Sequence, residues 1–329
     1  MRVGYLTAAI GAAVLAASVS IAPARASTNW QGYTYAPAAL ASYKGLERLA
    51  DQLREATKGE VNITVSPGGA MSINGNDIAQ AVGDGILQFG GTGGYAGYVP
   101  IGGIGRLPML YETKEEFDRA YAILEPYLKQ ALEAKNVVLV GHYVYPVQTV
   151  WSRTAVDGMD QMKDVKFRVV SPEQAAAVKL FGAVPVSMST PDVASALQRG
   201  AIDMLLTAAA GGGKLWYEML DTNYKLPVNW SLSLIIANKE AFDDLTAEQQ
   251  AAVMKAGADA GAWITKTFQE EDQAYTEKFE AAGLKVVQPT PAEVAKARAL
   301  VQPYWDEWAA SHSAEAKEAL SKIRTELGK

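Results

Sequence analysis

The chain has 329 residues with 36 acidic and 30 basic side chains, and a net charge of -6 at neutral pH. This acidic balance argues against a nucleic-acid partner. The absence of cysteine excludes disulfides, thiolate nucleophiles and zinc sites built on cysteine. A chain of this length without disulfides must be stabilised by its hydrophobic core, which we expect to be divided between two lobes.

The first 26 residues have the order of a secretory signal peptide. Arg2 gives a basic start, residues 5–21 are almost wholly apolar, and Ala24-Arg25-Ala26 is a small-residue cleavage site. We therefore expect export to the periplasm with cleavage after Ala26; the alternative is an uncleaved N-terminal anchor. Cleavage would leave 28 basic against 36 acidic residues, a net charge of -8.

The first half of the mature chain alternates strand-like and helix-like segments. Short apolar or β-branched runs predict strands at residues 30–35, 61–65, 87–90 and 137–140. Thr113 with Glu116 is a capping box that opens a helix reaching about Ala134. This alternation predicts an α/β fold with a largely parallel sheet.

The second half continues the pattern, with strands expected at residues 166–170, 202–206 and 231–237. Ser171, followed by Pro172 and Gln174, predicts a helix start. Thr246 with Gln249 opens a helix that no proline interrupts before Gly283. At ~1.5 Å per residue this helix would span roughly 50 Å, enough to brace both lobes.

We expect discontinuous lobes that the chain enters more than once. Lobe I is assigned residues 27–150 and about 238–265. Lobe II is assigned residues 151–237 and about 266–329.

Catalytic groupings are scarce. The two histidines, His142 and His312, are far apart in the sequence, so we expect no metal site and no cofactor. His142 follows a strand and is either a general base or a hydrogen-bonded structural residue. The glycine-rich run at residues 90–97 is not followed by a helix, which indicates a turn approaching a ligand or another segment rather than a dinucleotide site.

Arg168 is the charged residue that stands out. It lies in a predicted strand with apolar neighbours, where alternation places it on the face opposite Phe167 and Val169. An unpaired buried charge is costly, so this guanidinium needs an acidic partner, either an internal carboxylate or a bound anion. Its planar fork suits bidentate binding of a carboxylate.

Aromatic side chains gather near the ends of the predicted strands, where open α/β sheets bind ligands. They suggest a cleft with aromatic walls. We name four as candidate ligand contacts: Tyr33, Tyr95, Trp151 and Trp216.

Six ordered blocks resemble the solute-binding proteins of TRAP transporters, of the DctP type. They cover nearly the whole mature chain, and Arg168 lies in the fourth. The blocks are ATKGEVNITVSPGGAM (56–71), AVGDGILQFG (81–90), LPML (107–110), MKDVKFRVV (162–170), FGAVPVSMSTPDVASALQRGAIDM (181–204) and LIIANKEAFDDLTAEQQAAV (234–253).

The resemblance implies a two-lobed flytrap braced by a long helix. It implies a periplasmic receptor that captures a small organic acid anion and delivers it to membrane permease subunits. The scarcity of catalytic groupings predicts that the protein is not an enzyme. We expect a monomer or, because the long helix can support one, a homodimer. The family's signature arginine binds the substrate carboxylate, and by position it corresponds to Arg168. The resemblance therefore favours a bound anion over an internal carboxylate as its partner.

Two positions depart from the family. Many members have a second arginine where Gln148 falls, and an asparagine where Thr207 or Ala208 falls. The loss of one cation and one amide predicts a monocarboxylate with an apolar or aromatic body, contacted by Gln148, Thr207 and the aromatic residues. A receptor for a signalling partner and a periplasmic enzyme using His142 are the alternatives.

Overall fold

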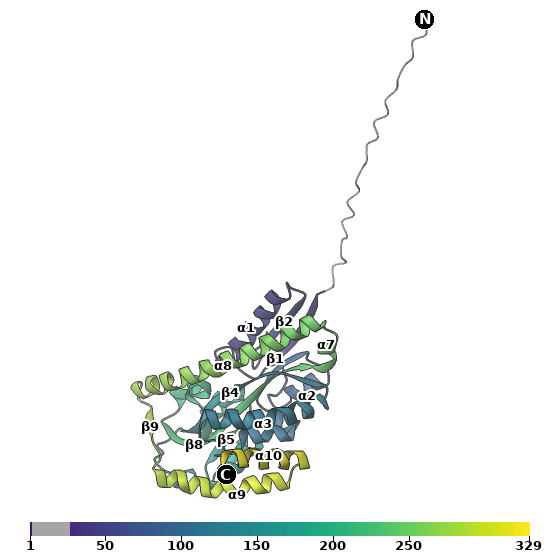
Figure 1. Ribbon diagram of the computed structural model, residues 1–329. Helices are drawn as coiled ribbons and strands as arrows, with labels where there is room; N and C mark the ends of the chain where they lie inside the picture. Colours follow the sequence, from purple (N-terminus) through teal and green to yellow (C-terminus); the bar gives the residue numbers. More distant parts are fainter. Residues whose placement is uncertain (2–26) are drawn as a thin grey trace.

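The computed structural model describes residue 1 and residues 27–329. The predicted signal peptide therefore lies almost wholly outside the described residues. Figure 1 shows an α/β protein in which helices cover both faces of a twisted sheet, as the sequence predicted. Within residues 27–329, no helix has both the length and the apolar run needed to cross a membrane.

One mixed sheet of nine strands forms the centre of the described chain, in the order β2-β1-β3-β8-β4-β7-β5-β6, with β9 pairing to β8. Pairing is parallel within β2-β1-β3, within β7-β5-β6 and between β8 and β9, and it is antiparallel for the pairs β3–β8, β8–β4 and β4–β7. The strands are β1 Thr28–Thr34, β2 Val61–Ser66, β3 Phe89–Thr92, β4 Val137–Ser152, β5 Lys166–Val169, β6 Val184–Ser187, β7 Met204–Thr207, β8 Thr222–Asn238 and β9 Lys285–Val287.

The two central strands are much longer than the sequence indicated. Their prolines lie where the pairing register shifts: Pro146 in β4 lies between the pairs Tyr145–Ser231 and Gln148–Asn229, and Pro227 in β8 lies between the pairs Gln148–Asn229 and Val150–Tyr224. Proline cannot donate to the strand ladder, so it is accommodated at such an irregularity without ending the strand. Both strands therefore run through the whole sheet and join its β1 half (β2-β1-β3) to its β5 half (β7-β5-β6).

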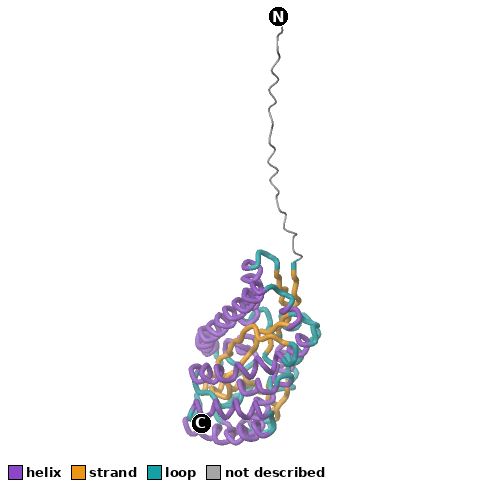
Figure 2. The backbone as a smooth tube through the Cα atoms, turned by 45° about the vertical axis from the view of Figure 1, so that its right-hand side comes forward, coloured by secondary structure: helices purple, strands orange, loops and turns teal. Residues whose placement is uncertain are grey.

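Figure 2 shows the helices packed around the strands of the sheet. In the β1 half, α3 and α10 pack on one face of the sheet and α1 packs on the other. In the β5 half, α9 packs on one face and α5 packs on the other. The helices are α1 Ala41–Ala56, α2 Ile78–Gly83, α3 Lys114–Glu133, α4 Pro172–Leu180, α5 Val193–Gln198, α6 Lys214–Trp216, α7 Lys239–Asp243, α8 Ala247–Ala281, α9 Pro291–Ala310 and α10 Ala314–Leu327.

The predicted helix starts are confirmed by their side-chain caps. The Thr113, Ser171 and Thr246 hydroxyls each accept a hydrogen bond from the backbone N–H three residues later. Helix α8 has 35 residues. Its first part packs against the β1 half through Val253 and Ile264, and its last turns reach the β5 half through Phe279. The long bracing helix is therefore confirmed (Figure 1).

Helix α8 lies unusually close to β4. A methyl group added at Gly261 would lie 2.0 Å from the carbonyl oxygen of His142, and one added at Gly257 would lie 2.3 Å from Val140. These two glycines, one helical turn apart, set the distance between the helix and the sheet.

We predict that Gly261→Ala destabilises the protein by about 1–3 kcal/mol, because overpacking against a backbone atom outweighs the helix propensity that alanine gains. Urea unfolding followed by circular dichroism measures this change. Gly97→Ala is the control, since a methyl group there meets nothing within 4 Å. Equal stability of the two variants would contradict the close packing.

Candidate ligand-binding site

A cavity of about 70 Å³ lies where strands of the two halves end. Its lining comes from segments that follow β1 and β3 in one half and β5, β6 and β7 in the other. This is the position at which open α/β sheets bind ligands. Within the described chain, the lining contains no aspartate, glutamate, lysine or histidine, and its charged groups are two arginines, Arg106 and Arg168.

Arg168 enters the cavity from β5. Phe167, its neighbour on the opposite face, packs in the core of the β5 half, and this fixes the strand's orientation. The Arg168 side chain is only 3% exposed. Its Nε donates to the carbonyl of Met188 at 3.1 Å, and its Nη2 donates to the hydroxyl of Thr190 at 3.4 Å. The guanidinium also lies 5.4 Å from the ring centre of Trp216.

Neither hydrogen bond of Arg168 goes to a carboxylate. Burial lowers the pKa of Arg168 to about 10, while the nearby hydroxyls of Tyr35 and Tyr145 act in the opposite direction. The group therefore stays charged at neutral pH. A buried charge without its counter-charge costs several kcal/mol, so an anionic ligand would stabilise this arrangement.

Arg106, at the end of the 3₁₀ segment η2 (Pro100–Arg106), faces the same cavity from the β1 half. It is 1% exposed. Its Nη2 donates to the carbonyl of Leu232 at 2.9 Å, and the guanidinium lies 5.7 Å from the ring centre of Tyr95. Its Nε and Nη1 are buried without a hydrogen-bond partner among the described residues.

This second guanidinium corrects the expectation drawn from Gln148. The sequence predicted a site with one cation, because the family's second arginine is replaced there. The cavity instead has two, since Arg106 supplies a cation from a different segment. Sequence reasoning missed it, although one signal was present: Arg106 is the only charged residue between Asp84 and Glu112.

Two tyrosine hydroxyls form the polar wall between the arginines. Tyr35 donates to the hydroxyl of Tyr145 at 3.1 Å, and Ser42 lies 3.1 Å from the same oxygen. Burial raises the pKa of Tyr145 well above its usual value, while the charge of Arg106 acts to lower it. Tyr145 therefore remains a neutral donor and acceptor at neutral pH.

Four of the seven predicted contact residues line the cavity: Arg168, Gln148, Thr207 and Trp216. Gln148 is buried and donates to the carbonyl of Pro146 at 2.8 Å. The Thr207 hydroxyl accepts from the backbone N–H of Gly212 at 2.8 Å, which holds the glycine turn η5 (Ala209–Gly213) against the cavity.

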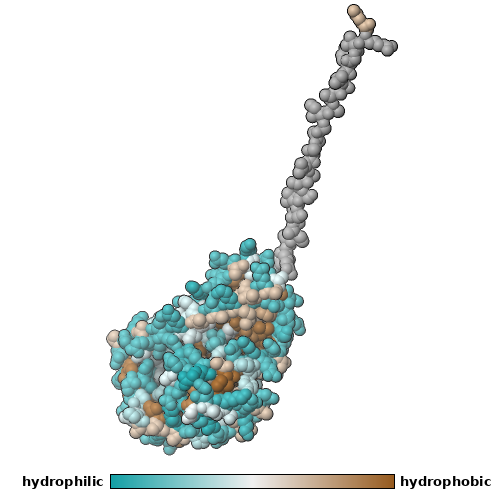
Figure 3. All heavy atoms as spheres, viewed as in Figure 1, coloured by the Kyte–Doolittle hydropathy of each residue, from teal (hydrophilic) through white to brown (hydrophobic). Residues whose placement is uncertain are grey.

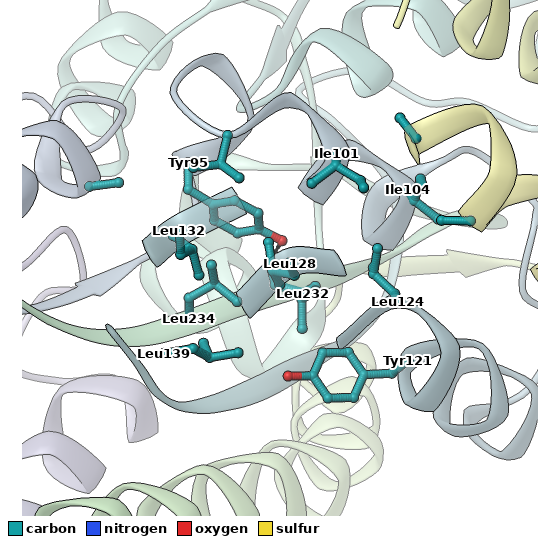
Figure 4. Close-up of a cluster of buried hydrophobic side chains, with 14 of the residues drawn as sticks. Tyr95, Ile101, Ile104, Tyr121, Leu124, Leu128, Leu132, Leu139, Leu232 and Leu234 are labelled. Carbon is teal, nitrogen blue, oxygen red and sulfur yellow. Dashed lines mark hydrogen bonds between the residues drawn. The ribbon is translucent and has the colours of Figure 1, made fainter. Parts of the chain in front are cut away.

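The other three, Tyr33, Tyr95 and Trp151, do not line it. Tyr33 accepts from the backbone of Gly69 at 3.2 Å. Figure 4 shows Tyr95 inside an apolar cluster, where its hydroxyl donates to the carbonyl of Leu232 at 3.3 Å. Trp151 is fully buried and its indole donates to the carbonyl of Thr207 at 3.0 Å. The geometry places these rings in the packed core that supports the cavity rather than at its surface.

The glycine-rich run after β3 does approach the cavity. Gly93 and Gly94 both line it, together with Asn76. A methyl group at Gly94 would lie 2.1 Å from the Asn76 side chain, so glycine is needed for this close approach. The sequence indicated such a turn.

Comparison with known proteins decides the family. The sequence profile of the bacterial extracellular solute-binding proteins, family 7 (DctP), matches residues 33–312. This chain belongs to that family. The resemblance to the TRAP solute-binding proteins is therefore confirmed, and with it the function of an extracytoplasmic receptor for small acids.

Two relatives illustrate the likeness. This family 7 protein is 26% identical to the 2,3-diketo-L-gulonate-binding periplasmic protein YiaO of Escherichia coli K12, over 73% of this chain and 75% of that one. It is also 26% identical to DctP7 of Bordetella pertussis, an extracytoplasmic solute receptor binding pyroglutamic acid. That superposition has a TM-score of 0.86 and covers 91% of this chain and 100% of the other.

A more distant solute-binding protein from Xanthobacter autotrophicus, with bound β-D-galacturonate, shares the fold. It is 21% identical, with a TM-score of 0.83 over 90% of this chain and 99% of that one. The family and fold are those of solute-binding receptors rather than enzymes. Proteins of this family bind small acids and work with a membrane permease, which implies a periplasmic location.

His142 lies outside the cavity, in a furrow between α3 and α8. Figure 3 shows that this face of the molecule is mostly hydrophilic, with some hydrophobic residues exposed on it. Its ring centre is 3.8 Å from that of Tyr121. Burial lowers the pKa of His142 to about 4, so the ring is neutral at neutral pH. This environment agrees with a structural residue.

We predict that His142 makes the protein acid-sensitive. Below pH 6.5 the unfolded chain binds a proton at this residue, whereas the folded chain does so only near pH 4, so stability falls as the pH is lowered. Between pH 7 and 4.5 the wild type should lose about 2 kcal/mol more than His142→Phe, which keeps the ring stacking. Urea unfolding at both pH values tests this; equal losses would contradict a buried neutral ring.

Proposed function

We propose that Arg168 captures the carboxylate of a small organic acid and that the protein hands this acid to its permease. One observation carries the proposal: a charged guanidinium is buried in a cavity whose described lining has no acidic side chain. A ligand carboxylate would supply the missing counter-charge. A charge-assisted bidentate pair in a water-poor cavity is much stronger than a surface pair.

The size of the cavity favours a compact ligand. About 70 Å³ of space for water-sized atoms is several times what one water molecule needs. Pyroglutamate, which the related Bordetella pertussis receptor is described as binding, is a compound of this kind and is the first acid to test.

Capture would depend on closure of the two lobes around the anion. Arg106 and Tyr35 come from the β1 half, and Arg168 and Thr190 from the β5 half, so a ligand held by both sets favours the closed arrangement. We propose the lobe division given by the sequence, except that β4 and β8 belong to both lobes and bend near the pair Gln148–Asn229. Cleavage of the leader after Ala26 remains part of the proposal.

We predict that Arg168→Lys weakens pyroglutamate binding about 10- to 100-fold, because the charge is kept but the two-pronged contact is lost. Isothermal titration calorimetry measures the change. Arg153→Lys is the matched control, since Arg153 pairs with Asp203 on the surface outside the cavity. Equal affinities of the two variants, with wild-type binding intact, would remove Arg168 from the site.

A further inference from the structure

Beside Gly93, three polar groups of the β1 half converge. A methyl group added at Gly93 would lie 3.0 Å from Nη2 of Arg106, 3.1 Å from the hydroxyl of Tyr35 and 3.2 Å from the hydroxyl of Ser233. A side chain at position 93 would therefore crowd these three atoms, and glycine leaves them uncovered beside the backbone. Arg106, Tyr35 and Gly93 itself all line the cavity that Arg168 enters from the other half.

The surroundings of Gly93 are rich in unused donors. Arg106 carries five N–H groups, and within the described residues only its Nη2 has a protein acceptor, the carbonyl of Leu232. The hydroxyls of Tyr35 and Ser233 lie 3.4 Å apart, and Ser233 is the donor in this long contact when Tyr35 donates elsewhere. Tyr35 itself donates to Tyr145. Guanidinium and hydroxyl donors beside Gly93 fit an oxygen acceptor.

The burial of Arg106 makes its unsatisfied donors energetically unfavourable. Arg106 is 1% exposed and pairs with no carboxylate in the described part of the chain. Arginine does not lose its proton in proteins, so the buried charge cannot be removed by a change of protonation. Buried donors without acceptors are destabilising, and the more so when they are charged. A ligand oxygen placed here would recover part of that cost.

Glu173 is the acidic side chain that could compensate the charge of Arg106 in place of a ligand. Its carboxylate packs against the backbone of Gly103, three residues before Arg106, and one of its oxygens is also buried without a partner. It does not line the cavity and forms no ion pair with Arg106. At most it balances the charge of Arg106 from a distance, and Nε and Nη1 of Arg106 stay without an acceptor among the described residues.

We infer that Arg106, with Tyr35 and Ser233 beside Gly93, forms a second ligand subsite that binds an oxygen acceptor, and that the receptor selects small carboxylates bearing such a second group. This inference rests on the proposed function, because Arg168 holds the first carboxylate. The second group is a carbonyl or a further carboxylate. A carboxylate with a purely apolar body would leave Arg106 unsatisfied, and the receptor discriminates against it for that reason.

The test compares matched acids by calorimetry. Pyroglutamate carries a ring carbonyl that cyclopentanecarboxylate lacks. The second pair, glutarate and pentanoate, differs by one carboxylate. We expect the wild type to prefer at least one acceptor-bearing acid by tenfold or more over its partner. Preference within the first pair would identify a neutral carbonyl, and preference within the second a dicarboxylate.

Two variants then probe the subsite in different ways. Arg106→Met removes the donor, and Gly93→Ala keeps Arg106 but places a methyl group against Arg106, Tyr35 and Ser233. Both should reduce the preference to less than about threefold, because they weaken binding of the acceptor-bearing acid more than binding of its apolar partner. Arg168→Lys should weaken both members of a pair equally and leave their ratio unchanged. Melting temperatures show whether each variant is folded, and Gly93→Ala remains informative if Arg106→Met is not.

The possible outcomes distinguish a failure of the Arg106 subsite from a failure of the proposed function of Arg168. If no acid binds the wild type, the proposed function fails and the inference fails with it. If acids bind without preference, or if the preference survives in folded Arg106→Met or Gly93→Ala protein, the subsite is disproved while Arg168 keeps its role. In that case Arg106 serves only to balance the charge of Glu173.

Discussion

The described structure depends on one electrostatic imbalance. Arg106 and Arg168 are buried in the same cavity, and the described chain supplies neither with a carboxylate. Proteins seldom bury unpaired charges, because the free-energy cost of desolvating a charged group is not offset unless an oppositely charged partner is present. Backbone carbonyls, aromatic faces and hydroxyls hold both groups in position but leave the charge uncompensated. The missing counter-charge is what a receptor for acids takes from its ligand.

The sheet makes this imbalance possible by bringing two halves together. β4 and β8 run through both halves, and their prolines lie where the register shifts. The strands of each half end at the same cavity, so Arg168 from β5 faces Arg106 from the segment after β3. Helix α8 packs along both halves. The arrangement suits a receptor whose halves move relative to one another around a bound molecule.

Much of the fold could be predicted from the sequence because its signals are local. Capping residues such as Thr113, Ser171 and Thr246 mark helix starts, and β-branched runs mark strands. The lengths of β4 and β8 could not be predicted, since Pro146 and Pro227 normally end strands and the compensating register shift depends on tertiary pairing. Arg168 could be identified because strand alternation makes its burial visible.

The other residues of the site were harder to predict from the sequence, because their roles depend on which side of a strand or loop faces the cavity. Trp151 and Tyr95 are aromatic residues near strand ends, yet their rings pack into the core. Arg106 lies in a glycine-rich irregular segment, where no periodicity predicts orientation. Its isolation among apolar residues was the available signal. A lone charge in a long uncharged stretch identifies a candidate site even where secondary structure cannot be assigned.

A crystal structure of the protein with pyroglutamate tests the account most directly. The account predicts carboxylate oxygens of the bound acid within about 2.7–2.9 Å of the Arg168 guanidinium, the distance expected for a charge-assisted hydrogen bond. An Arg168 side chain turned to an aspartate or glutamate of the protein itself, with the acid bound elsewhere, would contradict it.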